Sequence, residues 1–257
     1  MGIGRRLKDA VPDEYAEIMK QRFRHLATPI ARRRWRGDAH YCPLCENHVR
    51  EFRPSGIARR ENARCPVCGG LERHRLLWLY FNERTDLFDD RRKKLLHVSP
   101  EYLIGRRLRS HPSIDYLSSD LESKQAMVQM DITKIDMADN TFDVVICNHV
   151  MEHIPNDLQA MSELFRVLKP GGWAILQTPI GRAPTDEDSS LQTPSERVRR
   201  FGQRDHVRMY GPDYRDRLGS VGFDVNVDGY VRMLDPIVVA SYGLDVNEDI
   251  YYCRKTV

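Results

Sequence analysis

The chain has 257 residues, enough for one sizeable α/β domain with a small appendage. Its formal net charge of +3 gives no global argument for nucleic-acid binding, and no apolar run approaches the roughly 20 residues of a membrane-spanning helix. The N-terminus lacks the apolar core of a signal peptide, so we expect a cytoplasmic protein without a membrane span.

Residues 1–38 are expected to form a basic helical N-terminal segment. Its cationic residues gather in "KQRFRHLATPIARRRWRG" at 20–37. Such a cluster can meet phosphates or an anionic surface. Charge runs are more often solvated, so the pattern favours a basic helix and linker.

Residues 39–72 carry two cysteine pairs that predict a zinc-ribbon-like module. Cys42 and Cys45 form "CPLC", and Cys65 and Cys68 form "CPVCGG", with nineteen residues between the two pairs. Four thiolates at this spacing can close a tetrahedral shell around a structural zinc ion. Two disulfides or a redox pair are the alternatives, although disulfides suit a cytoplasmic chain poorly. The pattern at 71–88 predicts an amphipathic helix that follows the module.

Residues 73–257 alternate β-rich runs with helical patterns, which predicts an α/β domain with a mostly parallel sheet covered on both faces. The β-rich runs lie at 94–99, 114–119, 126–131, 142–148, 173–179, 223–230 and 249–255. The clearest helical patterns lie between them, at 156–169 and 212–222. Ligands of such sheets bind outside the carboxyl ends of the strands. The residues that follow each strand are therefore the first candidates for a binding site.

Two further stretches carry a resemblance to a known family. "DITKIDMADNTFDVVICNHVMEHI" followed by "LFRVLKPGGWAILQTPI" resembles the class I S-adenosylmethionine (SAM)-dependent methyltransferases of the methyltransferase type 11 kind, including ubiquinone-type O-methyltransferases. The resemblance covers about residues 94–230 and implies a Rossmann-like, doubly wound fold with a seven-stranded sheet. Residues 169–172, "KPGG", would form the turn before strand five.

The resemblance also implies a set of cofactor-binding residues. Asp120 would hold the ribose, Asp131 the adenine amino group and Ile132 the ring, while Asn148 and His149 would lie near the methionine part. The other members of the expected set are His97, Ser99, Glu101 and Leu121.

The opening loop "HVSPEYL" departs from the family pattern. His97 replaces the usual acid, and Ser99, Glu101 and Leu103 replace glycines. SAM has no phosphate, so an anion-binding nest is not essential. Glu101 places a carboxylate where the sulfonium or the ammonium group needs one. A degenerate domain that does not bind the cofactor is the alternative.

Three histidines are candidates for the base that removes an acceptor proton: His206 first, His149 second, and His153, whose local role is expected to be architectural. Glu152 and His153 also match part of the "E-x-x-E-H" segment that binds a divalent metal in ubiquinone-type enzymes, so a metal site there is an open alternative.

The polar segment 180–211 is expected to act as an acceptor lid, because long loops in compact domains are often functional. Arg208 and Tyr210 would line the acceptor mouth, and Arg182 would meet an anionic acceptor. We therefore expect O-methylation of a small molecule or glycan. The alternatives are an RNA methyltransferase that holds RNA through the zinc module and basic segment, and a non-catalytic binding module.

Overall fold

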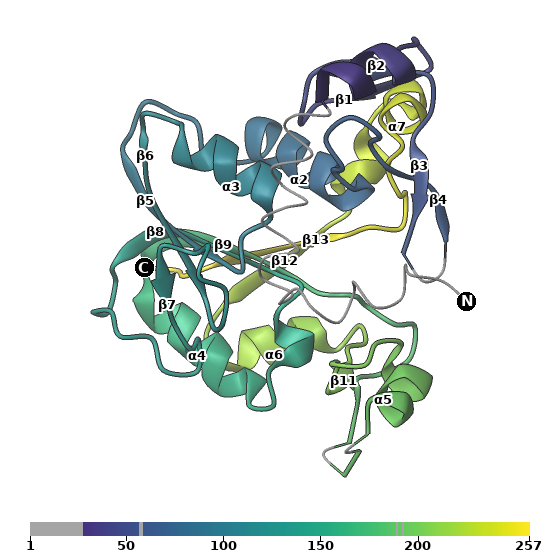
Figure 1. The fold of residues 1–257 in the computed structure, drawn as a ribbon. Helices are drawn as coiled ribbons and strands as arrows, with labels where there is room; N and C mark the ends of the chain where they lie inside the picture. The colour runs from purple at the N-terminus through teal and green to yellow at the C-terminus, as the bar shows by residue number, and fades with distance from the viewer. Residues whose placement is uncertain (1–27, 57–58, 189, 192) are drawn as a thin grey trace. The chain divides into compact units, whose positions relative to one another are not determined.

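The computed structural model describes residues 28–56, 59–188, 190–191 and 193–257 (Figure 1). Residues 1–27 of the expected basic segment lie outside the described residues, and residues 28–35 are helical. The chain divides into two compact units. The first runs to Tyr80 and includes Met233–Asn247, and the second comprises Phe81–Arg232 and Glu248–Val257. The division falls inside helix α2 (Glu72–Glu83).

The first unit contains two small antiparallel hairpins and a helix from late in the sequence. Strand β1 (His40–Cys42) pairs with β2 (Asn47–Val49), and β3 (Arg53–Ser55) pairs with β4 (Arg60–Arg64). Helix α7 (Pro236–Tyr242) belongs to the same unit.

Arg75 joins these parts of the first unit. Its side chain is fully buried, and its guanidinium donates hydrogen bonds to the carbonyls of Asn62, Ala63, Gly70, Tyr242 and Gly243. Because a buried charge is tolerated only when it is well bonded, this network ties the residues around α7 to the cysteine-bearing hairpins.

The second unit is built on a seven-stranded sheet in the order β12-β13-β9-β8-β5-β6-β7. All pairs are parallel except those of β13, which is antiparallel to both neighbours. The strands are β5 (Lys93–Val98), β6 (Ile114–Asp120), β7 (Val128–Gln129), β8 (Phe142–Asn148), β9 (Leu168–Gln177), β12 (Asp224–Asp228) and β13 (Ile250–Arg254). Each corresponds to one of the predicted runs, so the α/β class and the seven-stranded sheet are confirmed.

Helices cover both faces of this sheet. In Figure 1, α3 (Tyr102–Arg109) lies on one side, and α4 (Asp157–Val167) and α6 (Tyr214–Ser220) lie on the other. Side chains of the sheet and of α4 and α6 form one buried cluster, which includes Val145, Leu164 and Leu218. Two 3-10 turns, η2 (Met151–His153) and η3 (Tyr230–Met233), follow β8 and β12.

The expected turn at residues 169–172 is part of a strand. Strand β9 begins at Leu168, directly after α4, and its register against β8 shifts between the partners of Phe142 and Val144. Gly171 has a φ of 80° and donates its N–H to the carbonyl of Lys255. The Pro-Gly-Gly composition predicts a turn, but pairing with the chain beyond β13 supplies partners that a turn would lack.

Segment 180–211 is more ordered than its weak periodicity predicts. It contains β10 (Asp186–Glu187), which pairs with β11 (Arg208–Met209), and helix α5 (Pro194–Phe201) between them. Thr193 and Glu196 form a reciprocal capping box that starts α5. Among the described helices of the whole chain, none is both long and apolar enough to cross a membrane.

Candidate functional site

Five of the predicted cofactor residues lie at the carboxyl ends of β5, β6 and β8, which are neighbouring parallel strands: His97, Ser99, Glu101, Asp120 and Asn148. The Ser99 hydroxyl donates a 2.7 Å hydrogen bond to Asp120 Oδ2. The Asn148 amide donates a 3.0 Å hydrogen bond to Glu101 Oε1. Two carboxylates, Asp120 at the end of β6 and Glu101 after β5, are thus held at the carboxyl end of the sheet by neighbouring polar residues.

His97 explains how the altered first loop is held. Its ring is fully buried within β5, with Nε2 2.8 Å from Glu101 Oε2 and Nδ1 3.1 Å from the Tyr116 hydroxyl. With Asn148 on the other carboxylate oxygen, Glu101 is fixed from both sides at the start of α3. Tyr116 was not among the sequence candidates, because a tyrosine inside a strand gives no signal of such a role.

Asp120 is kept ionised by its surroundings. Burial would raise the pKa of this carboxyl, but N–H donation from Ser123, the Ser99 hydroxyl and N–H donation from Glu122 together lower the pKa below its usual value. An ionised carboxylate offers acceptors to a vicinal diol. This geometry suits the ribose contact that the resemblance implies.

The remaining cofactor candidates differ in exposure. Ile132 is buried, whereas Asp131 is exposed and accepts hydrogen bonds from the N–H and hydroxyl of Thr133. The Leu121 side chain is also exposed.

Two residues at the strand ends have left-handed backbone conformations. Ser99, after β5, has a φ of 44°, and His149, after β8, has a φ of 55°. Their N–H groups bond to the carbonyls of Ser119 and Gln177, at 2.7 Å each. Non-glycine residues rarely adopt this region, and backbone strain of this kind is concentrated at functional sites.

The candidate histidines surround one buried carboxylate. Glu152 accepts a 3.0 Å hydrogen bond from Thr178 Oγ1, and its Oε1 lies 3.4 Å from His149 Nδ1. The rings of His153 and His206 meet edge to face, with centroids 4.9 Å apart. Glu152 and His206 are buried, whereas His149 and His153 are partly exposed. The four predicted members of this cluster are therefore brought together, and Thr178 is an addition.

Arg208 and Tyr210 are buried rather than open to an acceptor. The Arg208 guanidinium donates to the carbonyls of Met151 and Pro155, and the Tyr210 hydroxyl donates to Asp157. Both side chains thereby hold the segment after β8 in place through hydrogen bonds. Arg182 is exposed.

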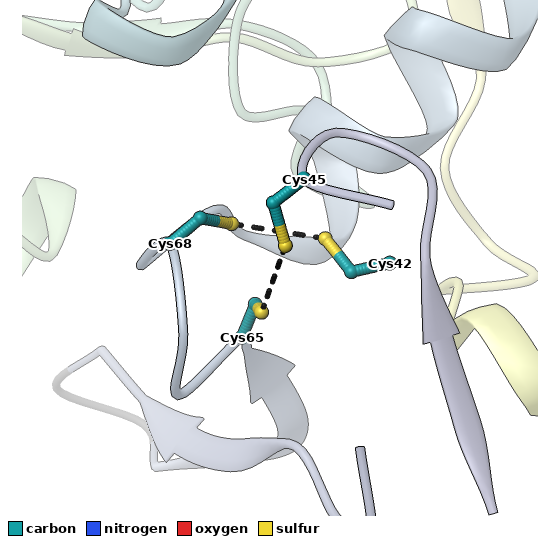
Figure 2. Close-up of side chains that lie close together, drawn as sticks. All are labelled: Cys42, Cys45, Cys65 and Cys68. Atoms are coloured by element: carbon teal, nitrogen blue, oxygen red, sulfur yellow. Dashed lines mark hydrogen bonds between the residues drawn. The ribbon is translucent and has the colours of Figure 1, made fainter. Parts of the chain in front are cut away.

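The four predicted zinc ligands of the first unit converge from two loops, as Figure 2 shows. The Sγ atoms of Cys42 and Cys68 lie 3.7 Å apart and those of Cys45 and Cys65 lie 3.8 Å apart. A tetrahedral zinc ion with Zn–S bonds of about 2.3 Å separates its sulfur ligands by about 3.8 Å, whereas a disulfide needs about 2.05 Å. The cysteines are free thiols in a geometry that fits zinc.

The two cysteine loops share one local conformation. In each, the residue after the second cysteine has a positive φ, 56° at Glu46 and 79° at Gly69, and donates its N–H to the carbonyl of the first cysteine at 2.8 Å. This repeated turn aims both sulfurs of a pair at the same point.

Part of the chain is similar in sequence to known methyltransferases. The model of a methyltransferase domain family matches residues 109–176, which extend from the last residue of α3 into β9. An uncharacterised methyltransferase of Mycolicibacterium paratuberculosis is 29% identical over 93 residues, 36% of this chain and 36% of that protein. A ubiquinone biosynthesis O-methyltransferase of Rickettsia conorii is 35% identical over 75 residues, 26% of each chain. The matched part of the chain thus spans between about a quarter and a little more than a third of the length of these relatives.

Among solved structures, a SAM-dependent methyltransferase from Mesorhizobium loti has the same fold. The TM-score is 0.51 at 12% identity, over 69% of this chain and 96% of that chain. The family match and the relatives support a methyltransferase domain, the predicted class, and the solved structure shows that the fold is shared.

Proposed function

We propose that this protein is a SAM-dependent methyltransferase that transfers the methyl group to a hydroxyl of a small molecule or glycan. The observation that carries the proposal is the pair of carboxylates at the strand ends, Asp120 bonded to Ser99 and Glu101 bonded to Asn148.

The residues of this edge match the chemistry of the cofactor. Asp120 would accept hydrogen bonds from the ribose hydroxyls, and Glu101 would face a cationic group of the methionine part. Ile132 would pack against the adenine and Asp131 would accept from its amino group. SAM, when bound, supplies an electrophilic methyl group and leaves as S-adenosylhomocysteine.

We assign the base to His149 in preference to His206. His149 directly follows Asn148 at the end of β8, and its Nδ1 faces the Glu152 carboxylate. A proton on Nδ1 would bond to Glu152 and leave Nε2 to accept the hydroxyl proton of the acceptor. His206 is buried and less open to an acceptor.

The four cysteines would hold a structural zinc ion in the first unit, because four thiolates leave no open position for substrate. Segment 180–211, with exposed Arg182, follows β9 on the ligand side of the sheet and would contact an anionic acceptor.

The direct test is calorimetric titration with SAM and S-adenosylhomocysteine. Micromolar binding is expected, with at least a tenfold loss in Asp120→Ala. Asp115→Ala is the matched control, because Asp115 is an exposed aspartate of the same strand, β6, away from its carboxyl end. Absence of binding in folded protein would overturn the proposal and favour a non-catalytic binding module.

A second candidate function, RNA methylation, is favoured by the composition of the first unit. Residues 28–80 contain no lysine, and their exposed cations are Arg32, Arg33, Arg34, Arg36, Arg50, Arg53, Arg59, Arg60 and Arg64. Arginine binds phosphate in a bidentate manner that lysine cannot reproduce. Retention on immobilised RNA that falls steeply between 50 and 200 mM salt, and that weakens in Arg50→Gln/Arg53→Gln, would favour this function.

A further inference from the structure

Arg75 lies beside the loop that presents the second cysteine pair. The Gly70 carbonyl accepts hydrogen bonds from the Arg75 guanidinium at 3.1 Å and from the Cys65 N–H at 2.8 Å. The N–H of Gly70 donates to Cys68 Sγ at 3.4 Å. The Ala63 carbonyl, two residues before Cys65, also accepts from the guanidinium, at 3.0 Å. Gly70 therefore connects the positive charge of Arg75 to both cysteines of this pair.

The guanidinium charge of Arg75 is buried without a carboxylate partner. Its five hydrogen-bond acceptors are all neutral backbone carbonyls. The Phe52 ring, whose centroid lies 3.9 Å from Cζ, is also uncharged. Among the described residues no carboxylate lies within ion-pair distance of Arg75, and Glu72, three residues earlier in α2, pairs with Arg60 at 2.7 Å. Because a buried charge is costly until an opposite charge compensates it, we expect a negative group close by.

The cysteine site supplies a negative charge in the same unit. A zinc ion neutralises only half of the charge of four thiolates, so a filled site is a dianion. Cys42 and Cys65 are buried, so water screens this charge poorly. Burial lowers the pKa of the Arg75 guanidinium, and negative charge on Cys42 and Cys65 opposes that effect. The guanidinium and the filled cysteine site are therefore complementary charges.

From this arrangement we propose that Arg75 is the counter-charge of the zinc–thiolate centre and makes its sulfurs poor nucleophiles. This role requires the zinc ion that is proposed for the four cysteines. Zinc has already displaced the thiol protons, so a neighbouring cation cannot increase the fraction of thiolate. It can only lower the nucleophilicity of each sulfur, which falls as the anion is stabilised. Arg75 thereby protects the centre from electrophiles and oxidants that would release the metal.

The segment that contains α7 fixes this counter-charge in place. Arg75 Nε donates to the carbonyl of Tyr242 at 2.6 Å, and Nη2 donates to that of Gly243 at 2.9 Å. Gly243 ends α7 with a φ of 56°, and a Cβ added there would lie 2.7 Å from the Phe52 ring. The inertness of the zinc centre therefore depends on residues late in the sequence as well as on the cysteine hairpins.

The test follows zinc release from the whole, zinc-loaded protein after addition of N-ethylmaleimide, with a chromogenic chelator as indicator. The reagent's C=C bond takes up a cysteine sulfur and a proton from water, and the Zn–S bond breaks. Arg75→Met is expected to release zinc about tenfold faster than wild type, whereas Arg75→Lys keeps the charge and should stay within about threefold. Arg64→Met is the matched control, because Arg64 directly precedes Cys65 but is exposed, so that solvent and salt screen its charge. Its release rate should equal that of wild type.

Equal release rates in wild type and Arg75→Met would overturn the counter-charge role. Release from Arg75→Lys as fast as from Arg75→Met would also overturn it, because the carbonyl bonds rather than the charge would then decide the rate. If circular dichroism shows that Arg75→Met does not fold, Arg75→Lys decides alone: a rate close to that of wild type supports the role, and a rate about tenfold higher contradicts it. Absence of zinc from freshly purified wild-type protein would instead overturn the zinc site itself, and the counter-charge with it. SAM titration of the same samples tests the cofactor site separately.

Discussion

Ser99 shows how a single residue can replace glycine in the loop after β5. Its left-handed backbone is the conformation that glycine adopts without cost, while its hydroxyl holds Asp120. The residue thus combines the turn of a glycine with a hydrogen bond that glycine cannot make. The loop therefore departs from the family pattern and still forms an ordered arrangement with Asp120 at the strand ends.

Substitutions at Ser99 should separate these two contributions. Ser99→Gly is expected to leave the free energy of unfolding within about 1 kcal/mol, because relief of backbone strain offsets the lost hydrogen bond. Ser99→Val is expected to lose about 2 kcal/mol or more, because a β-branched residue fits this region poorly. Urea denaturation measures the free energy of unfolding of both variants. Equal values for the two variants would contradict backbone strain at Ser99.

The low pKa of Asp120 predicts how its contribution depends on pH. Because the pKa of Asp120 in the folded protein lies below its usual value, the carboxyl group is ionised at and above that usual value and is protonated only as pH falls through the folded pKa. The ratio of SAM affinities between wild type and Asp120→Ala should therefore be constant from pH 8 to 5. Titrations at several pH values measure this ratio, and a fall of the ratio already between pH 7 and 5 would contradict the assignment.

At the scale of elements, hydrophobic patterning was sufficient to find all seven strands of the sheet, because each buries apolar side chains in a short run. Hydrophobic patterning was insufficient where hydrogen bonds between residues far apart in the sequence decided the structure. The "KPGG" stretch joins β9 because Gly171 and Gly172 bond to Lys255, a residue more than eighty positions away. Similarly, no local signal connects Glu152 with His206.

The close packing of Gly172 gives a prediction about β9. A Cβ added there would lie 2.8 Å from the carbonyl oxygen of Asp143, so Gly172→Ala is expected to destabilise the fold by about 1–3 kcal/mol. Gly219→Ala in α6 is the control, because nothing lies within 4 Å and alanine favours a helix by up to about 1 kcal/mol. The midpoint temperature of thermal unfolding should fall in Gly172→Ala and rise in Gly219→Ala. A change in the same direction in both variants would argue against this packing.

At the scale of the molecule, the first unit combines cysteine hairpins with a helix from the other end of the sequence. The cysteine spacing predicted that the four sulfurs converge, since each of two loops presents two sulfurs. The membership of α7 was not predictable, because it depends on the buried Arg75 and its carbonyl partners at Tyr242 and Gly243.

Removal of the proposed zinc ion should destabilise the whole first unit. With a strong chelator, amide hydrogen-exchange protection is expected to fall at 40–80 and also in α7, because metal binding supplies folding free energy to the unit. The central strands β5 and β8 should keep their protection. Exchange measured by mass spectrometry distinguishes the outcomes, and α7 protection that survives while the hairpins open would contradict a shared unit.

The discontinuous first unit has a consequence for the order of events during synthesis. Its cysteines leave the ribosome early, but α7 is made only after six of the seven strands of the sheet have been translated. Until then Arg75 lacks the two carbonyls of Tyr242 and Gly243. The cysteine-bearing unit is thus completed only after most of the sheet has been made, and the nascent chain holds an incomplete first unit until α7 is synthesised.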